Sequence, residues 1–90
     1  NNKIKWLYCI PKYPCQLAEY DFIKMEEFHG LSNHCLEREA ILNAVKHNAE
    51  IIEMHVTYNK NSDYIDNGVS FDFIECENII KDIRKIVDAN

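Results

Sequence analysis

The sequence lacks the features of several large classes of protein. It has 10 Lys and Arg against 15 Asp and Glu, a formal net charge of −5. No basic surface is therefore expected to neutralise phosphates, which argues against a nucleic-acid partner. No apolar run approaches the roughly 20 residues that span a bilayer, so no membrane partner is expected. Only two glycines and two prolines are present, which predicts regular elements joined by polar loops with few tight turns.

The four cysteines have no C-x-x-C spacing and no nearby His at a diagnostic spacing. Because the sequence also shows no signal peptide, we expect reduced thiols in a cytoplasmic protein and no cysteine nucleophile. Apolar residues make up 47% of the 90 residues, enough for a core. The absence of an initiator Met suggests a piece of a larger domain, and we expect residues 1–90 to form one such piece.

The hydrophobic pattern predicts strands that alternate with helices. Strands are expected at 3–10 and 51–57, helices at 16–28, 37–48 and 73–87, and a polar loop at 58–70. Between the first two helices, residues 30–32 form a very short extended piece that the pattern alone does not identify as a strand. The strand at 51–57 is mostly apolar, as in a strand buried on both faces. Alternation of this kind implies parallel strands with crossover helices. The expected fold class is α/β: three consecutive βα units of a (β/α)8 TIM-type barrel, which cannot close a barrel by themselves.

Five polar residues fall where the active site of such a barrel lies, at the C-terminal ends of the strands. His34 follows the short extended piece and His55 lies near the C-terminal end of the last strand, so both imidazoles could bind one divalent ion. Asp66 in the polar loop could hold a hydroxyl or assist proton transfer. Ser32 could donate to a phosphate, and Tyr13 could line a pocket. Each residue, taken alone, is also compatible with an ordinary polar or packing role.

Three further polar residues form no constellation in the sequence. Glu53 lies inside the strand at 51–57, so it is expected to be either buried and paired or near a cation. His29 and His47 are expected to be surface residues.

Taken together, these segments resemble the sialic acid synthase family. The segments 30–35 (GLSNHC) and 51–57 (IIEMHVT) are similar to the family's Gly-Tyr-Ser-Asp-His-Thr and Ile-Glu-Lys-His-Phe-Thr. The 21-residue gap from His34 to His55 also resembles the family's gap. Upstream, 9–14 (CIPKYP) is similar to the Cys-x-x-x-Tyr-Pro run that ends the sixth barrel strand. The resemblance covers nearly the whole chain and identifies it as the C-terminal part of the catalytic barrel.

The resemblance implies an activity and assigns roles. His34 and His55 match ligands of a divalent metal ion, Mn2+ or Mg2+, which makes the aldehyde of an N-acetylmannosamine-like sugar electrophilic. Phosphoenolpyruvate attacks this aldehyde, and phosphate is released as a sialic-acid-type nonulosonic acid forms. Ser32 matches a residue near the phosphate, while Tyr13 and Asp66 match residues on the sugar side. The two catalytic histidines and Asp66 form the expected catalytic set.

Several positions depart from the family pattern. Asn33 replaces the usual Asp, Cys35 replaces Thr, Pro11 occupies a position that is polar in some members, and Tyr64-Ile65 replaces the Gly-Pro before Asp66. These differences leave the choice of N-acetylhexosamine open.

The resemblance also implies parts that these 90 residues lack. The first five strands and the C-terminal antifreeze-like domain, which reaches a partner subunit in a homodimer, are not in the sequence. The isolated chain is therefore expected to be inactive. One alternative is a non-catalytic barrel fragment that self-associates through open sheet edges. Another is a different barrel aldolase or synthase.

Overall fold

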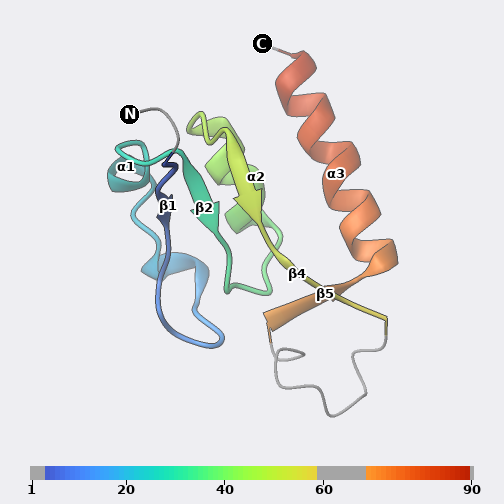
Figure 1. Ribbon diagram of the computed structural model, residues 1–90. Helices are drawn as coiled ribbons and strands as arrows, with labels where there is room; N and C mark the ends of the chain where they lie inside the picture. The colour runs from blue at the N-terminus through green and yellow to red at the C-terminus, as the bar shows by residue number, and fades with distance from the viewer. Residues whose placement is uncertain (1–3, 59–68, 90) are drawn as a thin grey trace.

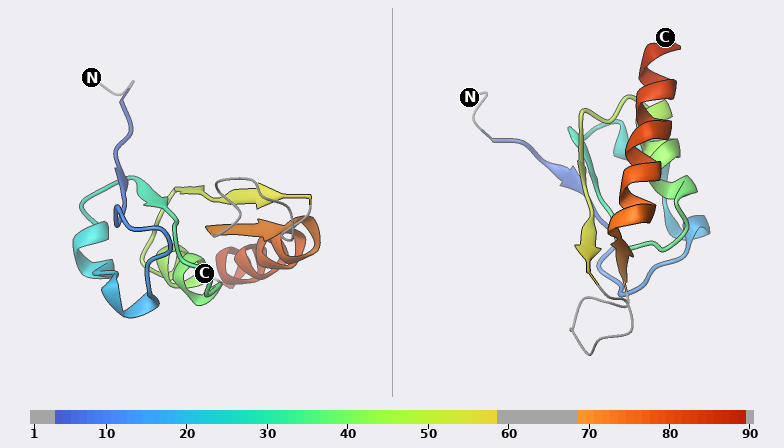
Figure 2. Two further views of the ribbon diagram at one scale, coloured as in Figure 1. Left: turned by 90° about the horizontal axis from the view of Figure 1, so that it is seen from below. Right: turned by 90° about the vertical axis from the view of Figure 1, so that its right-hand side faces the viewer.

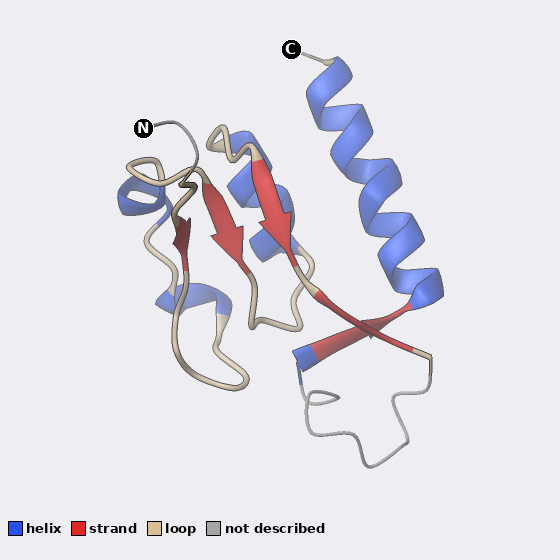
Figure 3. Ribbon diagram, viewed as in Figure 1, coloured by secondary structure: helices blue, strands red, loops and turns tan. Residues whose placement is uncertain are grey.

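Short parallel strands alternate with helices in the computed structural model, which describes residues 4–58 and 69–89 (Figure 1). The expected α/β class with parallel strands is confirmed (Figure 3). The elements are β1 (Leu7–Tyr8), the 3-10 helix η1 (Leu17–Glu19), α1 (Phe22–Met25), β2 (Gly30–Ser32), α2 (Glu39–Lys46), β3 (Ile51–Glu53), β4 (His55–Thr57), β5 (Ser70–Asp72) and α3 (Phe73–Asp88).

The strands form two small sheets. The first has the order β1-β2-β3, and its central strand β2 pairs in parallel with both neighbours. The second consists of β4 and β5, also parallel, with His55 opposite Ser70. Of the first predicted strand, only Leu7 and Tyr8 pair with β2.

The prediction of one continuous strand over 51–57 was wrong. The segment divides at Met54 into β3 and β4, since β3 pairs with β2 whereas β4 pairs with β5. Met54 packs against the core cluster of Ile41, Phe71 and Ile79. The segment is also not buried on both faces, because Val56 is 38% exposed.

Residues 59–68 of the predicted polar loop over 58–70 lie outside the described residues, and its predicted end at 70 is wrong. Ser70 already belongs to β5, a strand that the sequence analysis missed because three residues are too few for a periodic pattern. Its residues Ser70 and Phe71 are buried. Helix α3 follows at once, and Asp72 caps it by accepting from the main-chain N–H of Glu75 at 2.7 Å. The helix predicted at 73–87 is confirmed, as is the one predicted at 37–48, although α2 is shorter at both ends.

The single helix predicted over 16–28 was also wrong. The chain forms η1, then an extended residue at Tyr20 (φ −78°, ψ 134°), and then the short helix α1. Asp21 starts α1 by accepting a hydrogen bond from the main-chain N–H of Lys24 at 3.0 Å. The interruption allows the ring of Tyr20 to turn into the core, where it is buried.

Helices α2 and α3 lie side by side on one face of the strands (Figure 2). An ion pair between Arg38 and Asp82 joins the residue that precedes α2 to α3. Beneath the helices lie two clusters of buried side chains. One contains Cys15, Tyr20, Met25, Leu31, Cys35, Ala40 and Ala44, and the other contains Ile41, Phe71 and Ile79. No helix in the described part of the chain is long and apolar enough to cross a membrane.

Ile79→Ala is expected to lower the free energy of unfolding by about 2–5 kcal/mol, because Ile79 is 1% exposed and its truncation leaves a cavity. The matched control is Ile74→Ala in the same helix, where the side chain is 73% exposed and the expected loss is below about 1 kcal/mol. Urea denaturation of both variants measures the difference. Equal losses would contradict the placement of α3 against α2.

Gly30 lies where β2 and β3 approach too closely for a side chain. A Cβ atom at this position would lie 1.8 Å from the main-chain oxygen of Ile51, and the pairing of Gly30 with Ile51 holds that oxygen in place. Relief of this clash requires movement of the strands themselves.

Gly30→Ala is therefore expected to destabilise the fold by about 3 kcal/mol or more, since the added methyl group meets a main-chain atom. Circular dichroism and urea denaturation measure the effect. Glu27→Ala, at an exposed position in the turn that precedes β2, is the control and is expected to change stability by less than about 0.5 kcal/mol. Unchanged stability of Gly30→Ala would mean that β2 and β3 do not pair in this register.

Candidate active site

Two histidines meet beyond the carboxyl end of the first sheet. The strands β1, β2 and β3 run in the same direction, so the segments that follow β1 and β2 lie at the same end (Figure 1). His34 follows β2, and His55 is the first residue of β4, just beyond β3. The ring centres of His34 and His55 are 5.8 Å apart, with the rings tilted by 41°. The fold thus brings together the two residues that the sequence analysis selected as metal ligands.

The ring of His34 is held from two sides. It is buried, and its Nδ1 lies 2.9 Å from the main-chain oxygen of Ile10. Because a carbonyl oxygen only accepts, this contact places the proton of the neutral ring on Nδ1 and leaves the lone pair on Nε2. The ring of Tyr13 stacks on His34 at 4.1 Å between centres. A histidine that donates to a carbonyl through one nitrogen and offers the other is arranged as metal-ligating histidines usually are.

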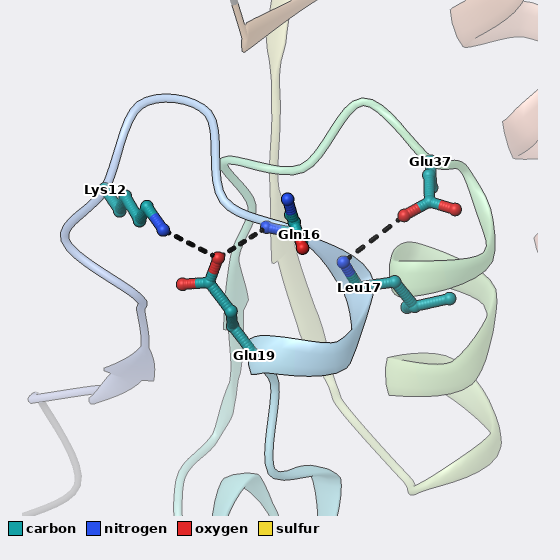
Figure 4. A network of polar contacts seen from close by, with 5 residues as sticks. All are labelled: Lys12, Gln16, Leu17, Glu19 and Glu37. Atoms are coloured by element: carbon teal, nitrogen blue, oxygen red, sulfur yellow. Dashed lines mark hydrogen bonds and ion pairs between the residues drawn. The ribbon is translucent and has the colours of Figure 1, made fainter.

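Tyr13 lies in the loop between β1 and η1. Polar contacts connect this loop to neighbouring elements (Figure 4). Lys12 Nζ donates to Glu19 Oε1 at 3.0 Å, and this hydrogen bond lowers the pKa of Glu19. The main-chain N–H of Leu17 donates to Glu37 Oε2 at 3.3 Å. The network therefore ties the loop after β1 to η1 and to the segment before α2. Tyr13 itself is 63% exposed, so one side of its ring remains accessible.

Ser32 and Glu53 form a second polar pair at the ends of β2 and β3. Ser32 Oγ donates to Glu53 Oε1 at 2.6 Å. The sequence predicted that Glu53 is either buried and paired or near a cation. In the structure it is paired with Ser32, but its side chain is exposed and not buried. Ser32 lies two positions before His34, and Glu53 lies two positions before His55. A ligand that accepts from Ser32 would have to compete with this carboxylate for the hydroxyl proton.

Cys9 is a site residue that the sequence analysis missed. Its Sγ lies 3.5 Å from His34 Nδ1 and 3.9 Å from Nε2. The contact joins positions 25 apart, so no local spacing signals it, and only the pairing of β1 with β2 brings them together. Partial burial of the thiol, followed by the nearby Cys15 thiol, raises the pKa of Cys9, which favours its protonated form. All four cysteines are free.

The two histidines fit a divalent ion as an incomplete set of ligands. Two imidazoles that share one ion through bonds of about 2.1 Å have ring centres roughly 4.5–5.5 Å apart. The observed 5.8 Å lies just outside this range. Within residues 4–58 and 69–89, no group of three or more His, Cys, Asp and Glu is arranged to hold a metal ion. Asp66, the predicted third member of the catalytic set, lies outside the described residues.

The remaining histidines lie away from this centre. His47 Nδ1 pairs with Glu26 Oε2 at 2.6 Å and its ring stacks on Phe22. His29 Nδ1 accepts from the main-chain N–H of Trp6 at 2.8 Å. Both are held by contacts elsewhere in the fold, with Glu26, Phe22 and Trp6.

The fold and the site define a parallel α/β protein with paired histidines at the carboxyl end of its strands. A sequence model of the NeuB family matches residues 1–90, so the chain belongs to this family, the sialic acid synthase family. The comparisons with curated proteins and with solved structures found no match.

The hydrogen bonds predict opposite tautomers for two histidines. Neutral His34 is expected to carry its proton on Nδ1, which donates to Ile10, and neutral His29 to carry it on Nε2, because its Nδ1 accepts from Trp6. Nitrogen-15 chemical shifts of the two rings measure this directly, and His29 is the internal control. The same tautomer in both rings would show that one of the two contacts is absent in solution.

Proposed function

We propose that this chain supplies the ion-holding part of the active site of a synthase. The synthase condenses phosphoenolpyruvate with an N-acetylmannosamine-like sugar, releases phosphate and yields a sialic-acid-type nonulosonic acid. The single observation that carries this proposal is the approach of His34 and His55 to 5.8 Å between ring centres. Membership of the sialic acid synthase family supports the same assignment. The whole reaction requires groups that these 90 residues do not contain.

The residues of the site have separate roles in this proposal. His34 Nε2 and the ring of His55 would hold a divalent ion, Mn2+ or Mg2+. When bound, such an ion polarises a carbonyl oxygen and makes its carbon electrophilic. Tyr13, accessible on one face, packs against the sugar and limits the orientations it can take. Ser32 lies on the phosphoenolpyruvate side, and Asp66 assists on the sugar side.

We further propose that the chain forms three consecutive βα units of a (β/α)8 barrel in a cytoplasmic, homodimeric parent enzyme. The parallel order of β1, β2 and β3 supports this architecture. So does the position of the site at the carboxyl end of the strands, where barrel enzymes bind their substrates.

A second candidate is self-association of the chain as a non-catalytic fragment. One observation favours it. In the described residues β1 lies at the edge of its sheet, and the adjacent Ile4 and Trp6 are 58% and 66% exposed. An uncovered edge with apolar neighbours is a surface to which another strand can pair. Analytical ultracentrifugation distinguishes this candidate, since a concentration-dependent dimer that binds no ion would favour it.

Addition of Mn2+ to the chain is expected to broaden the NMR signals of the His34 and His55 rings, and excess Mg2+ is expected to reverse the effect. The rings of His29 and His47 are the internal controls, because they lie away from the site. His55→Ala is expected to weaken Mn2+ binding by at least about tenfold. His47→Ala is the matched control and is expected to leave binding unchanged. Equal broadening of all four histidines, or none, would contradict the proposed ion site.

A further inference from the structure

A buried hydrogen-bonded pair, Tyr20 and Asn33, lies directly behind His34. Tyr20 is 7% exposed and Asn33 is fully buried. The Tyr20 hydroxyl donates to Asn33 Oδ1 at 2.9 Å and accepts from the main-chain N–H of His34 at 3.0 Å. One phenol group therefore holds both the side chain before the histidine and the main chain of the histidine itself.

Asn33 fixes the turn on the other side of His34. Its Nδ2 donates to the main-chain oxygen of Cys35 at 2.8 Å, and its Oδ1 accepts from the main-chain N–H of Cys35 at 3.3 Å. The main-chain N–H of Asn33 donates to the oxygen of Glu53 at 2.8 Å. The main-chain oxygen of His34 accepts from Cys15 at 3.0 Å. These bonds hold residues 33–35 at both ends and leave His34 little freedom to rotate about its main chain.

The position of Tyr20 requires a local change in the conformation of the main chain. Tyr20 interrupts the helical pattern of residues 16–28 with an extended conformation, and its ring enters a cluster with Tyr8 and Phe22. Burial raises the pKa of Tyr20 far above its usual range. This shift favours the protonated hydroxyl, the form that donates to Asn33.

We infer that Tyr20 and Asn33 are positioning residues that hold the main chain of His34 so that its ring faces His55. The Ile10 carbonyl and the stacked ring of Tyr13 then limit rotation of the His34 side chain. Asn33 stands where the family usually has Asp, and its amide donates to the Cys35 carbonyl, which a carboxylate cannot do. The consequence for ion binding rests on the proposed function, whereas the positioning itself does not.

The test compares Tyr20→Phe with Tyr8→Phe in the full chain. Each removes one hydroxyl from the same aromatic cluster. The Tyr8 hydroxyl accepts from the main-chain N–H of Asp21, whereas the Tyr20 hydroxyl bonds to Asn33 and His34. In Tyr20→Phe the amide of His34 is expected to exchange with solvent about tenfold faster, because its acceptor is gone. Mn2+ affinity is expected to fall by about 10–100-fold, as for other residues that orient a metal ligand. Tyr8→Phe is expected to change neither quantity.

The amide of Leu31 in β2 separates positioning from general destabilisation. Faster exchange at His34 with unchanged exchange at Leu31 supports the inference. Unchanged exchange at His34, or equal acceleration at both amides, overturns it. If Tyr20→Phe does not fold, exchange of the His34 amide is measured in the unmodified chain. A His34 amide that exchanges there as fast as an exposed amide also overturns the inference. If the unmodified chain binds no Mn2+, the ion site fails, and the His34 comparison alone decides the positioning role.

Discussion

The two-sided pairing of β2 is the constraint on which the rest of the structure depends. Among the described residues, this three-residue strand has a partner on both edges, β1 on one side and β3 on the other. The absence of a side chain at Gly30 allows β3 to approach closely. Beyond the strand, the hydrogen bonds continue on both sides, from Asn33 to Glu53 and from Cys15 to His34. A segment of six residues is thereby held from Gly30 to Cys35, and it carries Ser32 and His34 to the carboxyl end of the sheet.

The polar groups around His34 illustrate why a buried histidine requires an extended network. Buried main-chain groups that lose water need other partners, and each missing partner costs about 1–3 kcal/mol. Tyr20 and Asn33 provide these partners for the turn, and Ile10 provides one for the ring. These contacts compensate for the loss of water around His34. The contact with Ile10 also leaves Nε2 as the ring nitrogen with a free lone pair. Stability and the chemistry of the site are therefore linked through the same atoms.

The relative position of the two histidines depends on how the two core clusters are connected. His34 belongs to the region that packs around Leu31 and Tyr20, whereas β4 with His55 pairs with β5, whose Phe71 lies in the other cluster. Ile52 packs against both clusters. Because Ile52 and His55 lie on the same short segment, the packing of Ile52 connects the two halves of the site. The break at Met54 then redirects the chain toward β5.

Much of this architecture was predictable from the sequence, because it follows from local patterns. The apolar positions of α2 and α3 recur with helical periodicity, and alternation of helices with strands implies parallel pairing. The histidines were recognisable as strand-end residues, and the segments around them carried the family resemblance. The tertiary structure decided what local patterns cannot encode. It divided residues 51–57 between two sheets, turned Tyr20 out of a helix and into the core, and placed Cys9 against His34 across 25 positions. In each case the physical reason is a partner distant in the sequence, whose hydrogen bond or packing outweighs the local preference of the chain.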